Sequence, residues 1–160
     1  MLRSSLSSAL QTRVAALARE GAAIVVATRD GSLRPSIARA WGVEPVVGQD
    51  AIRLCVEAPA LSQMRKNLRP RAEIAVTVAR PVTYRSAQLK GVVVELGEPT
   101  EIDLARVDEH NDAFSLDAEA MGFSPPQAAR VIDREALLSV TITVQELFDQ
   151  TPGATAGAQL

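Results

Sequence analysis

The chain has 160 residues, of which 47% are hydrophobic and 22% are charged, as in one soluble domain with its own core. No apolar run approaches the length of a membrane span, and a 3% aromatic content leaves few stacking platforms for nucleic acid. The formal net charge is −2, but residues 1–98 carry 14 Lys/Arg against 8 Asp/Glu, whereas residues 99–160 carry 3 against 11. The basic part suits an anionic ligand, or equally the acidic part of the same or a second chain.

The cellular compartment is suggested by two features. Cys55 is the only cysteine, so the chain forms no internal disulfide, which fits a reducing compartment. The first 20 residues contain three arginines and lack the long apolar stretch of a signal peptide. We therefore expect a cytoplasmic protein.

The N-terminal residues 1–20 predict a helix. Leu6, Leu10, Val14 and Leu17 recur at helical spacing, and Gly21 stands where a helix-ending glycine belongs. A near-continuous apolar strand, "AAIVVATR", follows.

The rest of the chain reads as strands joined mostly by short turns. Period-two alternation or apolar runs predict six strands, at 22–29, 33–43, 51–57, 72–79, 83–97 and 137–148. A short helix is expected within 58–71, and an acidic helical insertion over 101–138, broken near Gly122 and Pro125. Residues 150–160 form a polar tail, and 1–160 is one domain.

This order of elements limits the fold. No alternation of strand and helix is present, which argues against a parallel doubly wound sheet. The pattern favours a small antiparallel barrel, closed or partly closed.

The stretch "TYRSAQLKG", residues 83–91, places polar and cationic side chains in a strand. Alternation directs Gln88 and Lys90 to one face and Leu89 to the other, and Gly91 predicts a bulge or a close backbone approach. Beyond it, Val92, Val94 and Leu96 are expected to face the core. The first half either faces a polar, anionic group or is a solvated strand end.

Four segments, in this order and spacing, resemble the pyridoxamine 5′-phosphate oxidase-like family of FMN-binding split barrels. They are "RPSIARAWG", "LSQMRKNLR", "AEIAVTVA" and "YRSAQLKG", and the tail "LFDQTPGATAG" is similar to endings in that family. The resemblance spans about 21–160. It implies a mainly β fold, a six-stranded antiparallel split β-barrel with N-terminal and peripheral helices, that forms a homodimer with FMN at the subunit interface.

The resemblance also implies which residues hold the cofactor. By this resemblance, Ser62, Arg65 and Lys66 would bind the FMN phosphate, because a dianion is stabilised by charge-assisted hydrogen-bond donors. Gln88 and Lys90 would contact the ribityl chain or the ring edge. Arg39 and Trp41 lie on the strand that runs beside the ring, although a lone tryptophan is more often a core or interface residue.

Two differences from the family pattern argue against pyridoxamine phosphate as the substrate. Met64 stands where relatives often carry a lysine, and the C-terminal segment lacks the Arg/His-rich pattern of the oxidases that make pyridoxal phosphate. We therefore expect an FMN-dependent oxidoreductase acting on another small substrate. A binding module that holds flavin, haem or deazaflavin without turnover, and a structural dimer without cofactor, remain alternatives.

Other chemistry has little support in the sequence. His110, the only histidine, lies among Asp108, Glu109 and Asp112, which we interpret as a solvated acidic face rather than a metal site. Cys55 is expected to be a buried, inert thiol. No phosphate-binding glycine motif is present.

Overall fold

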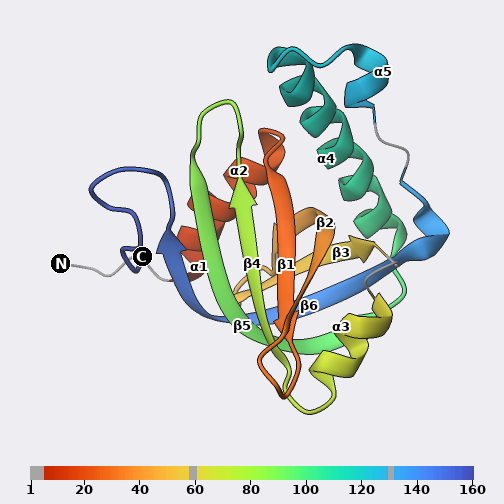
Figure 1. The fold of residues 1–160 in the computed structure, drawn as a ribbon, viewed down its shortest axis with the longest axis vertical. Helices are drawn as coiled ribbons and strands as arrows, with labels where there is room; N and C mark the ends of the chain where they lie inside the picture. The colour runs from red at the N-terminus through yellow and green to blue at the C-terminus, as the bar shows by residue number, and fades with distance from the viewer. Residues whose placement is uncertain (1–5, 58–60, 130–131) are drawn as a thin grey trace.

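The computed structural model describes residues 6–57, 61–129 and 132–160, and of Leu61 and Ser62 only the backbone. Its elements in chain order are α1 (Leu6–Ala9), η1 (Leu10–Ala15), α2 (Ala16–Arg19), β1 (Ala23–Arg29), β2 (Pro35–Pro45), β3 (Ala51–Glu57), α3 (Leu61–Leu68), β4 (Glu73–Ala79), β5 (Ser86–Gly97), α4 (Glu101–Ala120), α5 (Pro125–Ala128), η3 (Arg134–Ala136) and β6 (Leu137–Asp149). Figure 1 shows the strands wrapped around one core, with α3 below them and α4 along one side.

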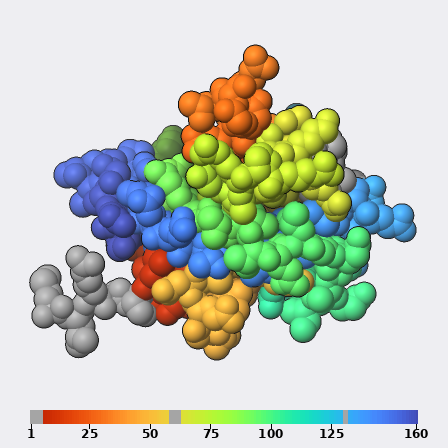
Figure 2. All heavy atoms as spheres, turned by 90° about the horizontal axis from the view of Figure 1, so that it is seen from below, coloured from red at the N-terminus to blue at the C-terminus, as the bar shows by residue number. Residues whose placement is uncertain are grey.

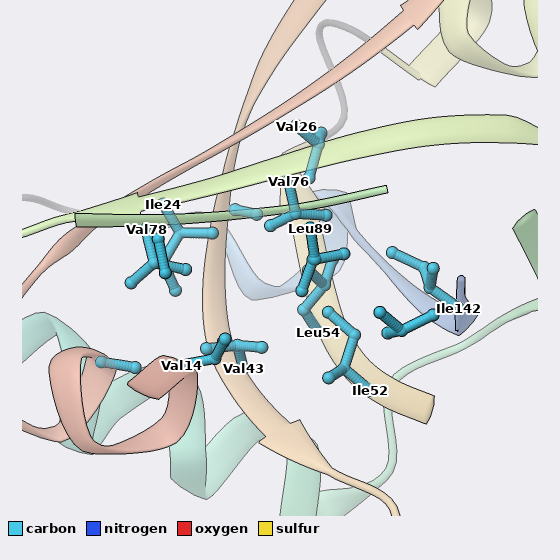
Figure 3. Packing of buried hydrophobic residues seen from close by; sticks show 14 of the residues in the cluster. Val14, Ile24, Val26, Val43, Ile52, Leu54, Val76, Val78, Leu89 and Ile142 are labelled. Carbon is cyan, nitrogen blue, oxygen red and sulfur yellow. The ribbon is translucent and has the colours of Figure 1, made fainter. Parts of the chain in front are cut away.

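The six strands form a closed antiparallel barrel in the order β1-β2-β3-β6-β5-β4, and β4 pairs with β1 to close it. The predicted fold class is therefore confirmed. The alternation read from the sequence decides which side chains point inward: Ile52, Leu54 and Val56 of β3 are all at most 1% exposed. Figure 3 shows such side chains from several strands meeting inside the barrel.

The N-terminal helix closes part of the barrel. Elements α1, η1 and α2 run on from one another over residues 6–19, with π-helical geometry in the middle. Leu10, Val14 and Leu17 are buried in the same cluster as the barrel interior, and Figure 3 shows Val14 beside Val43 of β2. The predicted helix and its apolar face are confirmed over residues 6–19, and residues 1–5 of the prediction lie outside the described part of the chain.

Strand β5 departs from the sequence-based expectation at its start. It begins at Ser86, because residues 81–83 form a turn in which Thr83 N–H bonds to the Arg80 carbonyl, and Tyr84 adopts a φ of 57°. The expectation of a strand from residue 83 was wrong by three residues. Arg85 instead pairs with Glu20 at 3.3 Å.

Gly91 fulfils its predicted role. The pairing of β5 with β6 shifts register between Lys90 and Gly91, and a Cβ at Gly91 would lie 2.1 Å from the Thr143 carbonyl oxygen. Only a glycine allows this approach.

Beyond Gly91, the expected core-facing positions were wrong. Val94 is 60% exposed and Leu96 is 39% exposed, although Val93 packs against the core. The pairing of β4 with β5 ends at Val92, and a second register shift follows between Val93 and Glu95. The second half of β5 therefore pairs with β6 alone and leaves these two side chains uncovered.

The acidic segment 101–138 contains α4, broken at Gly122 and before Pro125 as expected. Helix α4 packs on the outer face of β2 and β3, where Val107 joins Trp41 and Cys55 in a second buried cluster. The C-terminal residues fold back on β6, with Leu160 N–H donating to the Leu147 carbonyl at 2.8 Å.

Candidate functional groove

An open groove of about 500 Å³ lies on the outer face of the barrel across β1, β4, β5 and β6. Ala27, Ala75, Lys90 and Glu146 are paired in one row across these four strands. Their neighbours Val26, Val76 and Leu89 point into the core, so this row points outward. Two alanines give the groove a floor of methyl groups, and its volume falls within the roughly 300–1,000 Å³ of small-molecule sites.

Ion pairs stand at the rim of this groove. Arg29 bonds to Glu73 at 2.7 Å, and Lys90 lies 3.9 Å from Glu146. The Lys90 ammonium also stands 4.9 Å from the centroid of the Phe148 ring. Each of these cations thus faces a carboxylate, so the groove itself carries little net charge.

Gln88 lies one row further along the same outer face. Its side-chain amide donates to Thr77 Oγ1 at 3.2 Å, and the two residues are cross-strand partners. Gln88 and Lys90 are two residues apart on β5, which places them about 7 Å from one another along the strand. The structure therefore brings these two predicted residues together beside the groove.

Arg39 belongs to the same row as Gln88. Arg39 pairs with Val25, Val25 with Thr77, and Thr77 with Gln88. Three strand spacings separate the ends of this row, roughly 14 Å along the sheet. The guanidinium lies 5.5 Å from the ring centroid of Phe114 on α4, so Arg39 stands where α4 meets the open face.

Trp41 is placed away from the groove. It is 2% exposed, and its indole Nε1 donates to Glu57 Oε1 at 2.7 Å. Its ring packs against His110 and Phe114, with centroids 5.2 and 5.6 Å away. In this arrangement Trp41 joins α4 to the barrel.

Helix α3 presents the predicted cations. Arg65 and Lys66 are exposed, and no ion pair is formed by either one with the residues that the structure describes. The side chain of Ser62 lies outside the described part of the chain. Met64, where the sequence resemblance leads one to expect a lysine, is 2% exposed and belongs to the barrel core.

Sequence reasoning missed Asn67, one turn after Met64. It is 1% exposed, and its amide donates to Thr28 Oγ1 at 3.0 Å and to Ser36 Oγ at 3.2 Å. Thr28 also lines the groove. The spacing could have indicated this burial. Asn67 follows the apolar Met64 by three residues, which places both on the same, inner face of the helix.

His110 is buried rather than solvated, so the interpretation as an exposed acidic face was wrong for this residue. It is 5% exposed; its Nδ1 accepts from Gly42 N–H at 3.2 Å, and its Nε2 donates to the Ala22 carbonyl at 2.7 Å. Burial lowers its pKa, with the Ala22 bond acting in the opposite direction. Within the described residues, no group of three His, Cys, Asp or Glu side chains is arranged to hold a metal.

Cys55 is the buried thiol that the sequence predicts. Burial is the main cause that raises its pKa to about 12. Its thiol lies in the cluster with Trp41 and Val107, under α4. A nucleophilic role at neutral pH is therefore unsupported.

None of the helices in the described part of the chain is long and apolar enough to span a membrane. Neither a protein-family model nor a curated protein sequence matches this chain.

Solved structures match the fold at low sequence identity. One is a protein from Clostridium acetobutylicum related to general stress protein 26 of B. subtilis, of the pyridoxinephosphate oxidase family. It is 11% identical, with a TM-score of 0.55 and coverage of 94% of this chain and 93% of that one. An F420 reductase is 15% identical, with a TM-score of 0.53 and coverage of 82% and 93%. The chain thus has the split-barrel fold that the sequence resemblance implied.

Proposed function

We propose that this protein binds FMN in the groove on the outer face of β1, β4, β5 and β6, and acts as a flavin-dependent oxidoreductase on a small substrate. The observation that carries the proposal is the groove itself. Its alanine floor leaves room for a flat ring, while Gln88 and Lys90 offer polar contacts at its side.

The residues present fit a flavin mononucleotide. The amide of Gln88 combines donors and an acceptor, as the ring edge and the ribityl hydroxyls require, and Arg39 stands at the far end of its row. The rim cations are already paired, so the phosphate needs other partners. Arg65 and Lys66 on α3 supply two cations without ion-pair partners among the described residues.

The bound flavin would supply the hydride chemistry, while the chain binds and orients it. We assign no proton donor or acceptor among the described residues that line the groove. Glu73 has its pKa lowered mainly by the hydrogen bond from Arg29, which keeps it ionised. Substrate specificity would therefore come from the shape of the groove.

A homodimer is part of this proposal. Val94, Leu96 and Ile37 are large apolar side chains exposed at 60%, 39% and 68%, and they are the candidate contacts of a second copy. The cytoplasmic location expected from the sequence also stays a prediction.

The test is a titration of the purified protein, stripped of any chromophore, with FMN. We expect quenching of flavin fluorescence, and weaker binding in a variant that combines Gln88→Ala with Arg65→Ala. Arg19→Ala serves as a matched control, because Arg19 is an exposed arginine paired with Glu44, outside the groove lining. Unchanged affinity in the double variant, or no FMN binding by the unmodified protein, would contradict the assignment.

Activity requires a second measurement. Anaerobic bleaching of the bound flavin by a nicotinamide donor, followed by reoxidation, would support an oxidoreductase. Stable flavin that a donor does not reduce would support the non-catalytic binding module instead.

The fold also occurs in an F420 reductase, so a deazaflavin is the second candidate. A parallel titration with F420 distinguishes the two. Tighter binding of F420 than of FMN would replace the cofactor in the proposal and leave the groove as its site.

A further inference from the structure

Helix α3 has eight residues, too few to be stable without tertiary contacts. Met64 anchors it in the barrel core, and Asn67 anchors it to the β1–β2 hairpin. Figure 1 shows α3 beside this hairpin at the lower end of the barrel, and Figure 2 shows the two side by side from below. Leu68, at the end of the helix, also packs against the core. The apolar contacts of Met64 and Leu68 and the polar contact of Asn67 therefore hold the helix that carries Arg65 and Lys66.

The side-chain amide of Asn67 makes nearly all the hydrogen bonds that it can form. The Asn67 amide nitrogen uses both hydrogens, on Thr28 Oγ1 and Ser36 Oγ, and its Oδ1 accepts from Gln63 Nε2 at 2.9 Å. An amide can form about four such bonds, so three of them are made here. Burial at 1% exposure is tolerated because these partners replace water.

An apolar residue of similar size would also fill this position, and would avoid the cost of burying an amide. Apolar contacts, however, are not directional, so they leave a short helix free to rotate or slide on its anchor. The two hydrogen bonds from Asn67 to Thr28 and Ser36, in fixed directions, remove that freedom, whereas the bond from Gln63 lies within α3 itself. The contribution of Asn67 is thus the orientation of the helix more than its stability.

Orientation matters because the Asn67 contact connects α3 to the groove. Its partner Thr28 lines the groove from β1. Residues 65 and 66 precede Asn67 directly, and their side chains point away from the face that Met64 and Asn67 bury. Whatever rotates α3 about the Met64 anchor therefore moves both cations relative to the groove wall.

We propose that Asn67 is a positioning residue, which holds Arg65 and Lys66 at the phosphate of the ligand and so selects phosphorylated FMN over riboflavin. This inference rests on the proposed function of the groove. It differs from a purely structural role, because a structural role would affect both ligands alike.

The experiment compares FMN with riboflavin, which has the same ring and no phosphate. We expect the unmodified protein to prefer FMN by about tenfold or more, the size of one charge-assisted contact. In Asn67→Leu that preference should fall to about twofold, while riboflavin affinity changes by less than about twofold. Circular dichroism and a urea melt of each variant establish that it is folded.

A second variant covers the case in which Asn67→Leu fails to fold. Ser36→Ala removes one acceptor of the Asn67 amide from the β2 side, and it should lower the FMN preference in the same direction by a smaller factor. The matched control is Arg19→Ala, which removes an exposed arginine that pairs with Glu44 outside the groove lining.

The outcomes separate the two claims. If the unmodified protein prefers FMN and the Asn67→Leu and Ser36→Ala variants keep that preference, the positioning role is overturned and the groove remains. An equal loss of FMN and riboflavin affinity would also overturn it, in favour of a structural role. If the unmodified protein binds neither ligand, the proposed function fails, and this inference fails with it.

Discussion

The barrel has two outer faces that differ in their cover: a helix packs on one, and the other is open. The face of β2 and β3 is covered by α4, which buries Trp41 and Cys55. The face of β1, β4, β5 and β6 carries a row of small side chains, Ala27 and Ala75, and leaves an open groove above them. The chain thus supplies its own cover for one face and leaves the other open, where we propose that the ligand binds.

On the covered face, buried polar contacts of α4 add to the apolar cluster around Trp41 and Val107. The buried residues of α4 are Asp103, Val107, His110 and Asp117, at spacings of four, three and seven that keep them on one side of the helix. Asp103 pairs with Arg53 at 2.9 Å, and Asp117 pairs with Arg80 at 2.8 Å. Loss of these contacts should affect stability, whereas changes on the open face should affect ligand binding.

The largest stability effect is expected at the Arg53–Asp103 pair. Asp103 is 4% exposed and also closes the helix N-terminus with Thr100, so Asp103→Ala leaves a charged guanidinium without its main partner. Because Arg53 keeps a quarter of its surface in water, we expect a loss of about 2–3 kcal/mol, less than the roughly 3–5 kcal/mol of a fully buried pair.

Urea unfolding measures this loss, and thiol labelling of Cys55 reports whether α4 opens locally. Labelling should be slow in the unmodified protein and faster in Asp103→Ala, while FMN affinity is unchanged. If Asp103→Ala kept full stability, or if it lost FMN binding, the claim that the covered face serves stability and the open face serves binding would be wrong.

The second-largest expected effect is a pH dependence of the free energy of unfolding, caused by His110. Only the neutral ring, with its proton on Nε2, satisfies both Gly42 N–H and the Ala22 carbonyl. Because its pKa is lowered in the folded state, the unfolded chain binds the extra proton more readily. Stability should therefore fall as the pH drops below about 6.5, and this loss ends below the folded-state pKa.

One proton sets the limit of this effect, at most about 1.4 kcal/mol per pH unit. His110 is the only histidine, so His110→Gln should flatten the stability profile between pH 7 and 5. The charged groups beside the ring are Arg19 and Glu44, and Arg106 and Glu109 on α4. A profile equally steep in the variant would show that His110 is not the source of the pH dependence.

The smallest stability effect is expected on the open face. Lys90 and Glu146 are about half exposed and 3.9 Å apart, a separation at which such pairs contribute little. Lys90→Ala should change the free energy of unfolding by less than about 0.5 kcal/mol. The FMN affinity of Lys90→Ala should nevertheless fall. If this variant instead lost stability and kept its FMN affinity, the role assigned to the open face would be wrong.

The sequence predicted the barrel well because apolar alternation has a direct physical cause, the burial of one face of each strand. The alternation over Ile52, Leu54 and Val56 is visible in the sequence, and so is the glycine at position 91. It did not show that β4 ends opposite Val92, since the length of a partner strand is a property of the fold.

The docking of α4 could not be predicted in the same way. Its buried face contains two aspartates and a histidine, which a sequence pattern assigns to solvent. Their partners Arg53, Arg80, Ala22 and Gly42 are distant in the chain, so only the fold reveals them. Asn67 was missed for the same reason, because its partners lie on the β1–β2 hairpin.

Of the predicted site residues, Gln88 and Lys90 lie beside the groove, Arg39 lies at the edge of the same face, and Trp41 lies beneath α4. Strand alternation could indicate that all four point outward. It could not indicate which outward face the chain itself would cover.

The central claim is that the face with Ala27 and Ala75 is left open for a flavin. The most direct measurement is an FMN titration of Ala75→Phe, which places an aromatic ring on the floor of the groove, with Thr143→Phe as a control at an exposed position outside the groove lining. We predict that Ala75→Phe remains folded and loses FMN binding, while Thr143→Phe binds like the unmodified protein. FMN affinity unchanged in a folded Ala75→Phe variant would contradict the account.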